Sequence, residues 1–331
     1  MPPRPREDEA QFDAALRPTQ FSEFVGQKQV VANLKVFLKA ARDRGEPVDH
    51  ILLSGQPGLG KTTLAGLVAH EMNAPLVTTS GPALERAGDL AGLLTRLDAG
   101  SILFVDEIHR LPATVEEYLY SAMEDRFINI VLDSGPHART MKLDVPPFTL
   151  VGATTREGLL SDPFRARFGV LLRLEPYPEA ELVAILKRSA ALLQVSLEPA
   201  GAEVIAQRSQ GTPRLANRYL RRVRDFAQVE GDGKVTAKGA AASLERLGID
   251  ALGLVPIQRQ ILEVLSKHGG GPLGLKTISA YAGEEEATLE DVHEPYLIRL
   301  GFLKRTPRGR VAAEEGLRHI GVAKKKASEL F

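Results

Sequence analysis

Apolar residues in the first half of the chain follow two alternating patterns. Short runs rich in apolar and β-branched residues are typical of strands in a parallel sheet. Such runs lie at 51–53, 75–79, 101–105, 148–153 and 170–174. The segments between them carry apolar residues at helical spacing, as in the series Leu90, Leu93, Leu94 and Leu97. Because strands alternate with helices, we expect a parallel α/β sheet.

One stretch departs from this alternation and predicts a β-hairpin. Phe127–Leu132 and Ala138–Leu143 each alternate apolar with polar side chains. Asp133–Pro136, between them, is rich in residues that favour turns. We therefore expect a hairpin over residues 127–143 that projects from the core of this domain.

The strand pattern stops after Glu175–Pro178, and helical spacing takes over. A small helical domain is predicted, with helices over Leu182–Leu193, Ala202–Arg208, Arg214–Gln228 and Ala237–Leu247. Gly248–Gly253 is interpreted as a linker. The rest predicts three helices, over Ile257–Lys267, Leu275–Ala282 and Thr288–Leu300, and then two short strands around a turn within 302–312. Three helices followed by a two-stranded hairpin favour a winged helix.

The length of 331 residues also favours more than one domain. We expect a flexible leader at 1–15, an α/β domain at 16–176, a helical domain at 177–250 and a winged-helix domain at 256–331. Met1–Glu9 is proline-rich and charged and lacks the apolar core of a signal peptide. No apolar run reaches membrane-spanning length, so we expect a cytoplasmic protein without a membrane partner.

Composition narrows the chemistry that the chain can perform. A hydrophobic content of 44% and a charged content of 25% are typical of a globular protein. The absence of cysteine excludes disulfides, thiolate zinc sites, iron–sulfur clusters and a cysteine nucleophile. The seven histidines are scattered, so the expected metal is Mg²⁺ carried with a nucleotide. A formal net charge of zero argues against a wholly cationic nucleic-acid binder but allows a local basic patch.

Gly55–Thr63 has the spacing of a phosphate-binding loop, with a predicted strand before it and a predicted helix after it. Its glycines let main-chain N–H groups converge on an anion, and the helix N-terminus adds partial positive charge. Lys61 can then reach the β- and γ-phosphates, and Thr62 can offer its hydroxyl to Mg²⁺. A glycine-rich turn with a chance lysine would not need the flanking strand and helix. The loop therefore predicts nucleotide binding.

Asp106 and Glu107 end the third predicted strand. Carboxylates at the carboxyl end of a parallel strand face the ligand crevice, so we expect Asp106 to hold Mg²⁺ and Glu107 to activate the attacking water. With Ile108 and His109 they form a D-E-I-H run that superficially copies a helicase box. That class needs a second α/β domain, whereas the chain after Pro178 predicts only helices and a wing. His109 is therefore interpreted first as a polar residue at the start of a helix, with a contact role as the alternative.

Three further residues are candidates for a role in nucleotide hydrolysis. Thr154 ends the fourth predicted strand, where its hydroxyl can contact the γ-phosphate or the water. Arg167 precedes the fifth strand at the domain edge, where it can reach a neighbouring subunit's nucleotide as an arginine finger. A surface salt bridge is the simpler interpretation of Arg165. Arg214 starts a helix of the second domain and can reach back to the γ-phosphate.

The C-terminal end is cationic. From Arg299 onward the chain has nine Lys and Arg residues and three Glu residues. This excess favours DNA binding through the phosphate backbone without sequence preference. Arg305, Arg308 and Arg310 are the expected DNA contacts, whereas Lys324–Lys326 is more simply a solvated tail.

The order of these motifs resembles that of the AAA+ ATPases, and more narrowly that of the RuvB family of bacterial Holliday-junction branch-migration motors. The resemblance covers nearly the whole chain, from Leu16 to the predicted wing. Its most specific stretches are Gly58–Ala65, Asp106–Leu111, Gly152–Arg156, Arg167–Gly169, Arg222–Ala227 and Arg305–Arg310. Gln56 departs from it, since the family more often has proline there.

The resemblance implies an ATPase that binds ATP or ADP with Mg²⁺. The residues that it places at the nucleotide are Leu16, Arg17, Gly58, Gly60, Lys61, Thr62, Thr63, Glu124, Asp125, Arg126, Tyr177, Pro213 and Arg214. Among these, Leu16 and Arg17 would line the adenine pocket, and Tyr177 would lie near the base at a hinge between domains. Thr154 and Arg214 would be the two sensors, and Arg167 the finger in trans.

The resemblance also implies partners. The chain would form a hexameric ring on duplex DNA at Holliday junctions and drive branch migration in recombination and repair. The hairpin 127–143 would dock the junction-binding protein RuvA, and the resolvase RuvC would join a larger complex.

Two other classes stay open from the sequence. A clamp-loader-like AAA+ ATPase usually has a Ser-Arg-Cys finger, whereas Ala166-Arg167-Phe168 stands here. A nucleotide-switched DNA-binding regulator that hydrolyses little would not need the combination of Glu107, Thr154, Arg167 and Arg214.

Overall fold

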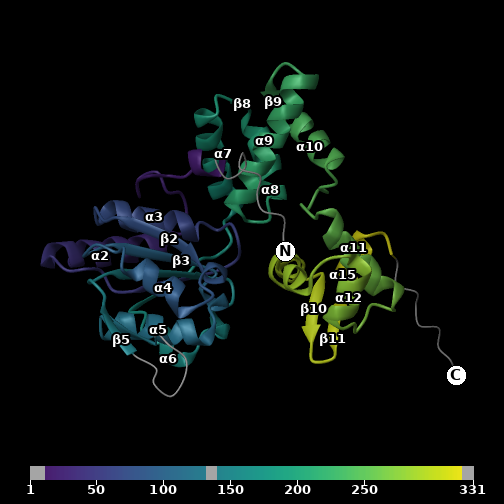
Figure 1. Cartoon of the computed structure of the whole chain (residues 1–331). Helices are drawn as coiled ribbons and strands as arrows, with labels where there is room; N and C mark the ends of the chain where they lie inside the picture. Colours follow the sequence, from purple (N-terminus) through teal and green to yellow (C-terminus); the bar gives the residue numbers. More distant parts are fainter. Residues whose placement is uncertain (1–11, 132–139, 323–331) are drawn as a thin grey trace. The chain divides into compact units, whose positions relative to one another are not determined.

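The computed structural model describes residues 12–131 and 140–322. The chain divides into two compact units (Figure 1). The first runs from Arg17 to Tyr177, and the second contains the chain from Pro178 onward together with the residues before Arg17. Among the described helices, none is both long and apolar enough to cross a membrane.

The first unit is built on a parallel sheet, as the hydrophobic pattern predicts. In spatial order its strands are β2 (Leu76–Ser80), β3 (Ile102–Asp106), β6 (Thr149–Thr154), β1 (Ile51–Ser54) and β7 (Val170–Arg173). All pairings between neighbouring strands are parallel. Every residue of β1 and β6 is buried, because these strands lie inside the sheet with packed layers on both faces.

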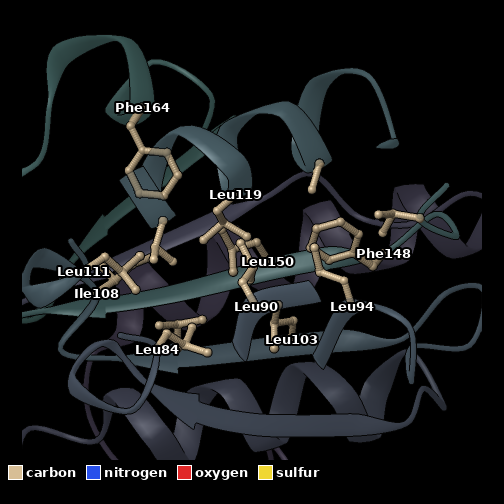
Figure 2. Packing of buried hydrophobic residues seen from close by; sticks show 14 of the residues in the cluster. Leu84, Leu90, Leu94, Leu103, Ile108, Leu111, Leu119, Phe148, Leu150 and Phe164 are labelled. Carbon is tan, nitrogen blue, oxygen red and sulfur yellow. The ribbon is translucent and has the colours of Figure 1, made fainter. Parts of the chain in front are cut away.

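Helices and short turns connect these strands. They are α2 (Lys28–Arg44), α3 (Lys61–Glu71), α4 (Ala87–Leu94), α5 (Ala113–Glu124) and α6 (Asp162–Arg165), with 3₁₀ turns at Gly81–Ala83, Ile108–Arg110 and Glu157–Leu159. Figure 2 shows buried leucines and phenylalanines filling the space between the sheet and the helices packed on one face. Leu90 and Leu94 of α4 and Leu119 of α5 meet Leu103 and Leu150 of the sheet there.

The predicted hairpin is confirmed. β4 (Phe127–Val131) pairs antiparallel with β5 (Thr140–Asp144), with Phe127 opposite Asp144. The predicted turn at Asp133–Pro136 lies outside the described residues. The exposed Met141 and Lys142, whose Nζ lies 4.1 Å from the centre of the Phe127 ring, give this hairpin a mixed apolar and cationic surface.

The second unit begins with four helices, as expected. They are α7 (Glu179–Leu192), α8 (Pro199–Arg208), α9 (Pro213–Glu230) and α10 (Ala237–Arg246). The expectation that strands stop after Pro178 is wrong, because β8 (Ser196–Leu197) and β9 (Lys234–Val235) form a short parallel pair. Two residues per strand give too little periodicity for a sequence pattern to reveal them.

Two segments expected to be loose are packed in this unit. Residues 12–15, which the sequence assigned to a flexible leader, are helical, and Asp13 lies 3.4 Å from the Arg214 guanidinium. The linker predicted at Gly248–Gly253 is an ordered junction. In it the Asp250 carboxylate accepts the N–H groups of Leu252 and Leu254, and a Cβ on Gly253 would lie 2.4 Å from the Arg208 carbonyl oxygen.

The last part of the unit has the predicted helices and wing. Its elements are α11 (Pro256–Lys267), α12 (Leu275–Ala282), α13 (Glu286–Thr288), α14 (Glu294–Arg299), β10 (Leu303–Thr306), β11 (Gly309–Ala312) and α15 (Glu314–His319). The third predicted helix is interrupted by a π turn at Leu289–His293, next to Pro295, which has no N–H to donate. The sequence pattern missed α15.

Candidate nucleotide site and wing

The phosphate loop joins β1 to α3, as its motif requires. The Lys61 ammonium is almost buried and donates to the carbonyl oxygens of Gly55, at 2.6 Å, and Gln56, at 2.9 Å. Burial lowers the pKa of Lys61, against the attraction of Asp106 and Glu107. A Cβ on Gly55, which has a φ of 145°, would lie 2.7 Å from the Leu174 carbonyl oxygen, so only glycine fits this turn.

The two carboxylates lie at the carboxyl end of β3. An Asp106 oxygen accepts the Glu107 N–H at 3.0 Å, and Glu107 has a left-handed φ of 51°. Both act electrostatically on Lys61, so the structure brings these three predicted residues together. The 3₁₀ turn that begins at Gly81 lies directly against the main chain of Glu107, since a Cβ on Gly81 would lie 2.4 Å from the Glu107 carbonyl oxygen. Left-handed backbone at a non-glycine residue is a feature that functional sites often retain.

Thr154 is fully buried at the end of β6, and its hydroxyl lies 2.9 Å from the Nδ1 atom of His109. The same hydroxyl oxygen accepts the Arg156 N–H at 2.9 Å. The His109 Nε2 atom lies 3.6 Å from a Glu107 carboxylate oxygen, and the His109 side chain is only 5% exposed. His109 lies in the 3₁₀ turn Ile108–Arg110, at a helix start as expected, and its ring is enclosed between two predicted catalytic groups.

Arg167 follows α6 and is held within the first unit. Its guanidinium pairs with the Glu124 carboxylate at 2.7 Å and donates to the Tyr120 hydroxyl. With Arg126 it lines a recess of about 450 Å³ that also includes His50. Arg165 pairs with Asp162 one helical turn away, in agreement with the salt bridge expected for it.

Tyr177 lies beside the phosphate loop, where its hydroxyl donates to the Leu59 carbonyl oxygen at 3.2 Å. No sequence pattern pointed to a nearby contact of the Gln27 side-chain amide, which exchanges two hydrogen bonds with the main chain of Glu175. Leu16, Pro213 and Arg214 belong to the second unit. In that unit the Leu16 carbonyl oxygen accepts from Arg188 at 2.7 Å.

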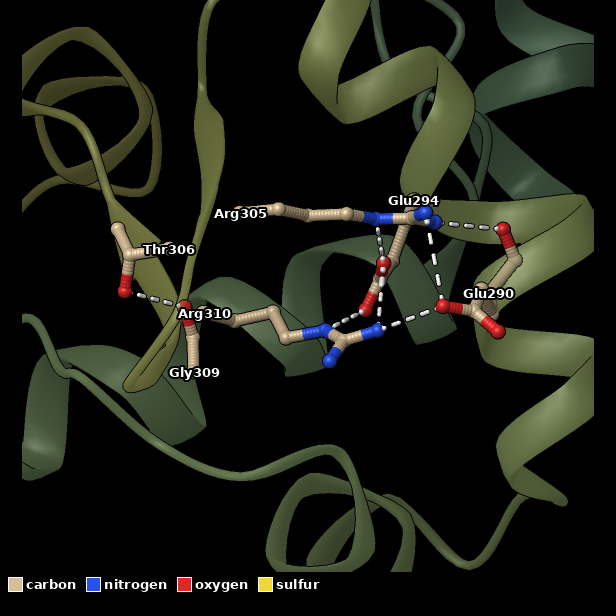
Figure 3. Close-up of polar contacts among 6 residues, drawn as sticks. All are labelled: Glu290, Glu294, Arg305, Thr306, Gly309 and Arg310. Carbon is tan, nitrogen blue, oxygen red and sulfur yellow. Dashed lines mark hydrogen bonds and ion pairs between the residues drawn. The ribbon is translucent and has the colours of Figure 1, made fainter.

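The wing carries a cluster of two arginines and two glutamates (Figure 3). Arg305 and Arg310 are directly opposite each other on β10 and β11. The Glu294 carboxylate, 1% exposed, accepts from Arg305 at 2.7 Å and from Arg310 at 2.8 Å. Glu290 lies 3.0 Å from the Arg310 guanidinium. Two of the three predicted DNA-contact arginines are thus ion-paired, whereas Arg308 is exposed at the turn.

Comparison with known proteins covers nearly the whole chain. Three family models match in succession: the Holliday junction DNA helicase RuvB P-loop domain over residues 16–174, the RuvB AAA lid domain over 177–250 and the RuvB C-terminal winged helix domain over 251–321. A relative from Myxococcus xanthus, the Holliday junction branch migration complex subunit RuvB, is 57% identical over 306 residues. That alignment covers 92% of this chain and 89% of the relative.

Solved structures agree with this comparison. The Thermotoga maritima RuvB Holliday junction branch migration motor is similar with a TM-score of 0.85 and 47% identity, over 93% of this chain and 99% of that one. A substitution variant of the same motor gives a TM-score of 0.86 at the same identity, over 93% of this chain and 98% of that one. The chain belongs to the RuvB family of Holliday junction DNA helicases.

Proposed function

We propose that this protein is an ATP-driven motor that moves duplex DNA and so drives branch migration of Holliday junctions in recombination and repair. The observation that supports it most is the convergence of Lys61, Asp106 and Glu107 at one end of the parallel sheet. A phosphate loop beside a strand-end carboxylate pair is the arrangement that nucleotide hydrolysis uses.

In this proposal each site residue has one task. Lys61 would neutralise the β- and γ-phosphates, and Glu107 would take a proton from the water that attacks the γ-phosphorus. Thr154 would hold the γ-phosphate or that water through its hydroxyl. The Thr62 hydroxyl and the Asp106 carboxylate are oxygen donors of the kind Mg²⁺ prefers, and they would hold the ion. Mg²⁺ would offset negative charge on the phosphates as the terminal bond breaks.

The site would be completed at a seam between subunits of a hexameric ring. Arg167 would leave Glu124 and reach the nucleotide of the neighbouring subunit, with Glu124–Arg126 beside it. Arg17 would line the adenine pocket, and Tyr177 and Arg214 would sense the bound nucleotide from the same subunit. Hydrolysis would then change the angle between the α/β domain and the helical domain and pull DNA through the winged helix.

The partners follow from the same proposal. The mixed apolar and cationic surface of β4–β5 would dock RuvA, and RuvC would join the complex at the junction. Arg308, together with Arg305 and Arg310, would contact DNA phosphates without reading bases. The activity would take place in the cytoplasm, where bacterial chromosomal DNA lies.

Strand displacement on a synthetic four-way junction, with ATP and with or without RuvA, tests the proposal. We expect displacement and DNA-stimulated ATP hydrolysis by the wild type, and neither by Lys61→Ala, which lacks the ammonium that neutralises the phosphates. His70→Phe, at an exposed position on the same helix, is the matched control and should behave as the wild type. A wild type that binds the junction but never displaces strands would contradict the motor.

A further inference from the structure

His109 has no task in the mechanism proposed above, yet it is one of the most enclosed polar side chains near the site. Its Nδ1 atom lies 2.9 Å from the Thr154 hydroxyl, and its Nε2 atom lies 3.6 Å from the Glu107 carboxylate. The ring therefore connects the residue proposed to contact the γ-phosphate with the residue proposed to activate water.

The backbone fixes this position from several sides. The left-handed turn at Glu107 leads directly into the 3₁₀ turn Ile108–Arg110. Ile108 is completely buried and packs against Gly152 of β6, where a Cβ would lie 2.9 Å from the Ile108 Cδ1 atom. Because the turn is held by packing on the sheet, the backbone of His109 is fixed beside Thr154, and its contacts change through movement of the ring alone.

The Glu107 carboxylate favours the tautomer that has the ring hydrogen on Nε2, the atom that faces it. The Nδ1 atom can then accept the Thr154 hydroxyl hydrogen, while the Thr154 oxygen accepts the Arg156 N–H. With Nδ1 accepting, the ring hydrogen lies on Nε2, which faces the Glu107 carboxylate. A separation of 3.6 Å is longer than a hydrogen bond, so a small shift of the ring or of the carboxylate would make or break this contact.

We propose that His109 is a positioning residue that couples γ-phosphate contact at Thr154 to the orientation of the Glu107 base. This inference rests on the proposed ATPase. When the Thr154 hydroxyl turns towards the phosphate or the attacking water, its bond to Nδ1 changes, and the ring moves relative to Glu107. The Glu107 carboxylate is then aligned for proton removal only while a triphosphate is bound, and hydrolysis depends on that alignment.

The test replaces His109 with phenylalanine, which fills the same space without either ring nitrogen. We expect kcat to fall by at least about tenfold, since positioned general bases contribute about 10²–10⁴ in rate. The dissociation constant for ATP should change less than about twofold, because the lost contacts are not made to the nucleotide. The exposed His70→Phe serves as the matched control and should keep the wild-type rate.

A double-mutant cycle separates coupling from a general loss of structure. In the Glu107→Gln background, His109→Phe should not lower the residual hydrolysis further, because the ring acts only through the carboxylate. His109→Gln places an amide near the Nε2 position and should recover at least about threefold of kcat over His109→Phe. If His109→Phe fails to fold, the same cycle is measured with His109→Gln. We then expect a smaller loss of kcat in the single variant and no loss in the Glu107→Gln background.

Several outcomes would overturn the coupling. They are a wild-type rate in His109→Phe, a multiplicative loss in the double variant, and a weakening of ATP binding equal to the loss of kcat. A wild type without ATP hydrolysis would remove the proposed function itself. If the wild type hydrolyses ATP normally and His109→Phe hydrolyses it at the same rate, only the proposed coupling is excluded.

Discussion

At the scale of single residues, buried polar groups in the first unit are placed by partners that lie far away in sequence. His50, just before β1, accepts the Leu150 N–H through its Nδ1 atom at 2.8 Å and packs against the Phe148 ring. Burial lowers the pKa of His50, although Met123 and Asp49 act in the opposite direction. The folded protein therefore holds this ring neutral at pH values where the unfolded chain begins to protonate it.

This shift predicts a pH dependence of stability. The unfolded state binds more protons than the folded state as pH falls below the ordinary value of 6.5, so the contribution of His50 to the free energy of unfolding is lost on acidification. His50→Asn is the matched variant, because its amide oxygen can accept the Leu150 N–H but does not titrate. Urea unfolding between pH 7.5 and pH 5.5 should show a larger loss of stability in the wild type. An equal loss in both proteins would contradict the assignment.

At the scale of elements, the wing is joined to the helices in two ways. Leu273 and Arg310 exchange main-chain hydrogen bonds of 2.9 and 2.7 Å, and Gly309 permits this approach, because a Cβ there would lie 2.3 Å from the Leu273 carbonyl oxygen. The second connection is the ion-pair cluster centred on Glu294. Two arginines directly opposite each other would repel. The buried Glu294 carboxylate between them attracts both guanidinium groups, so Glu294, Arg305 and Arg310 form a brace that holds the wing to α14.

The brace predicts different outcomes for two neighbouring arginines. Arg310→Ala should destabilise the winged helix by about 3 kcal/mol. This is the low end of the cost of removing one partner of a buried ion pair, because Arg305 still neutralises Glu294. Arg308→Ala, at an exposed position, should leave the free energy of unfolding within about 0.5 kcal/mol. Chemical denaturation of the two variants makes the comparison. Equal stability would argue against the brace.

DNA affinity of Arg308→Ala tests phosphate contact by itself, because this exposed side chain does not belong to the ion-pair cluster. Arg308→Ala should weaken duplex binding and reduce the salt dependence by about one phosphate contact. Unchanged affinity in Arg308→Ala would count against the turn of the wing as a DNA contact.

At the scale of the whole molecule, the proposed mechanism assigns tasks to residues of both units and of a second subunit. Lys61 and Glu107 lie in the first unit, and Arg214 lies in the second. Arg167 is ion-paired to Glu124 within its own subunit, so its proposed role needs that pair to open when a neighbour arrives. ATP hydrolysis would then depend on assembly.

Mixing two inactive variants tests this dependence. Arg167→Ala keeps its own phosphate loop and lacks the finger, whereas Glu107→Gln keeps the finger and lacks the base. Each alone should bind ATP without turnover. An equal mixture should recover up to about a quarter of the wild-type rate, because about one seam in four then joins an intact Glu107 base to an intact Arg167 finger. A mixture no more active than its components would exclude a finger supplied in trans.

Local sequence patterns were enough to predict the parallel sheet, the phosphate loop, the hairpin and the wing. These features depend on residues close together in the chain, where helical or strand spacing and the glycine spacing of Gly55–Thr63 carry the information. It also predicted that Asp106 and Glu107 lie near Lys61, because carboxyl ends of parallel strands share one edge of a sheet.

The partner of each buried polar group, in contrast, depends on how the elements pack in three dimensions. His109 and Thr154 are 45 residues apart and meet because β3 and β6 are neighbours in the sheet, an order that local spacing does not specify. Likewise, Arg310 and Glu294 meet across 16 residues because the wing folds back on α14. Side-chain pairing depends on the positions of whole elements, so a cationic run in the sequence cannot distinguish an arginine that faces solvent from one that pairs with a buried carboxylate.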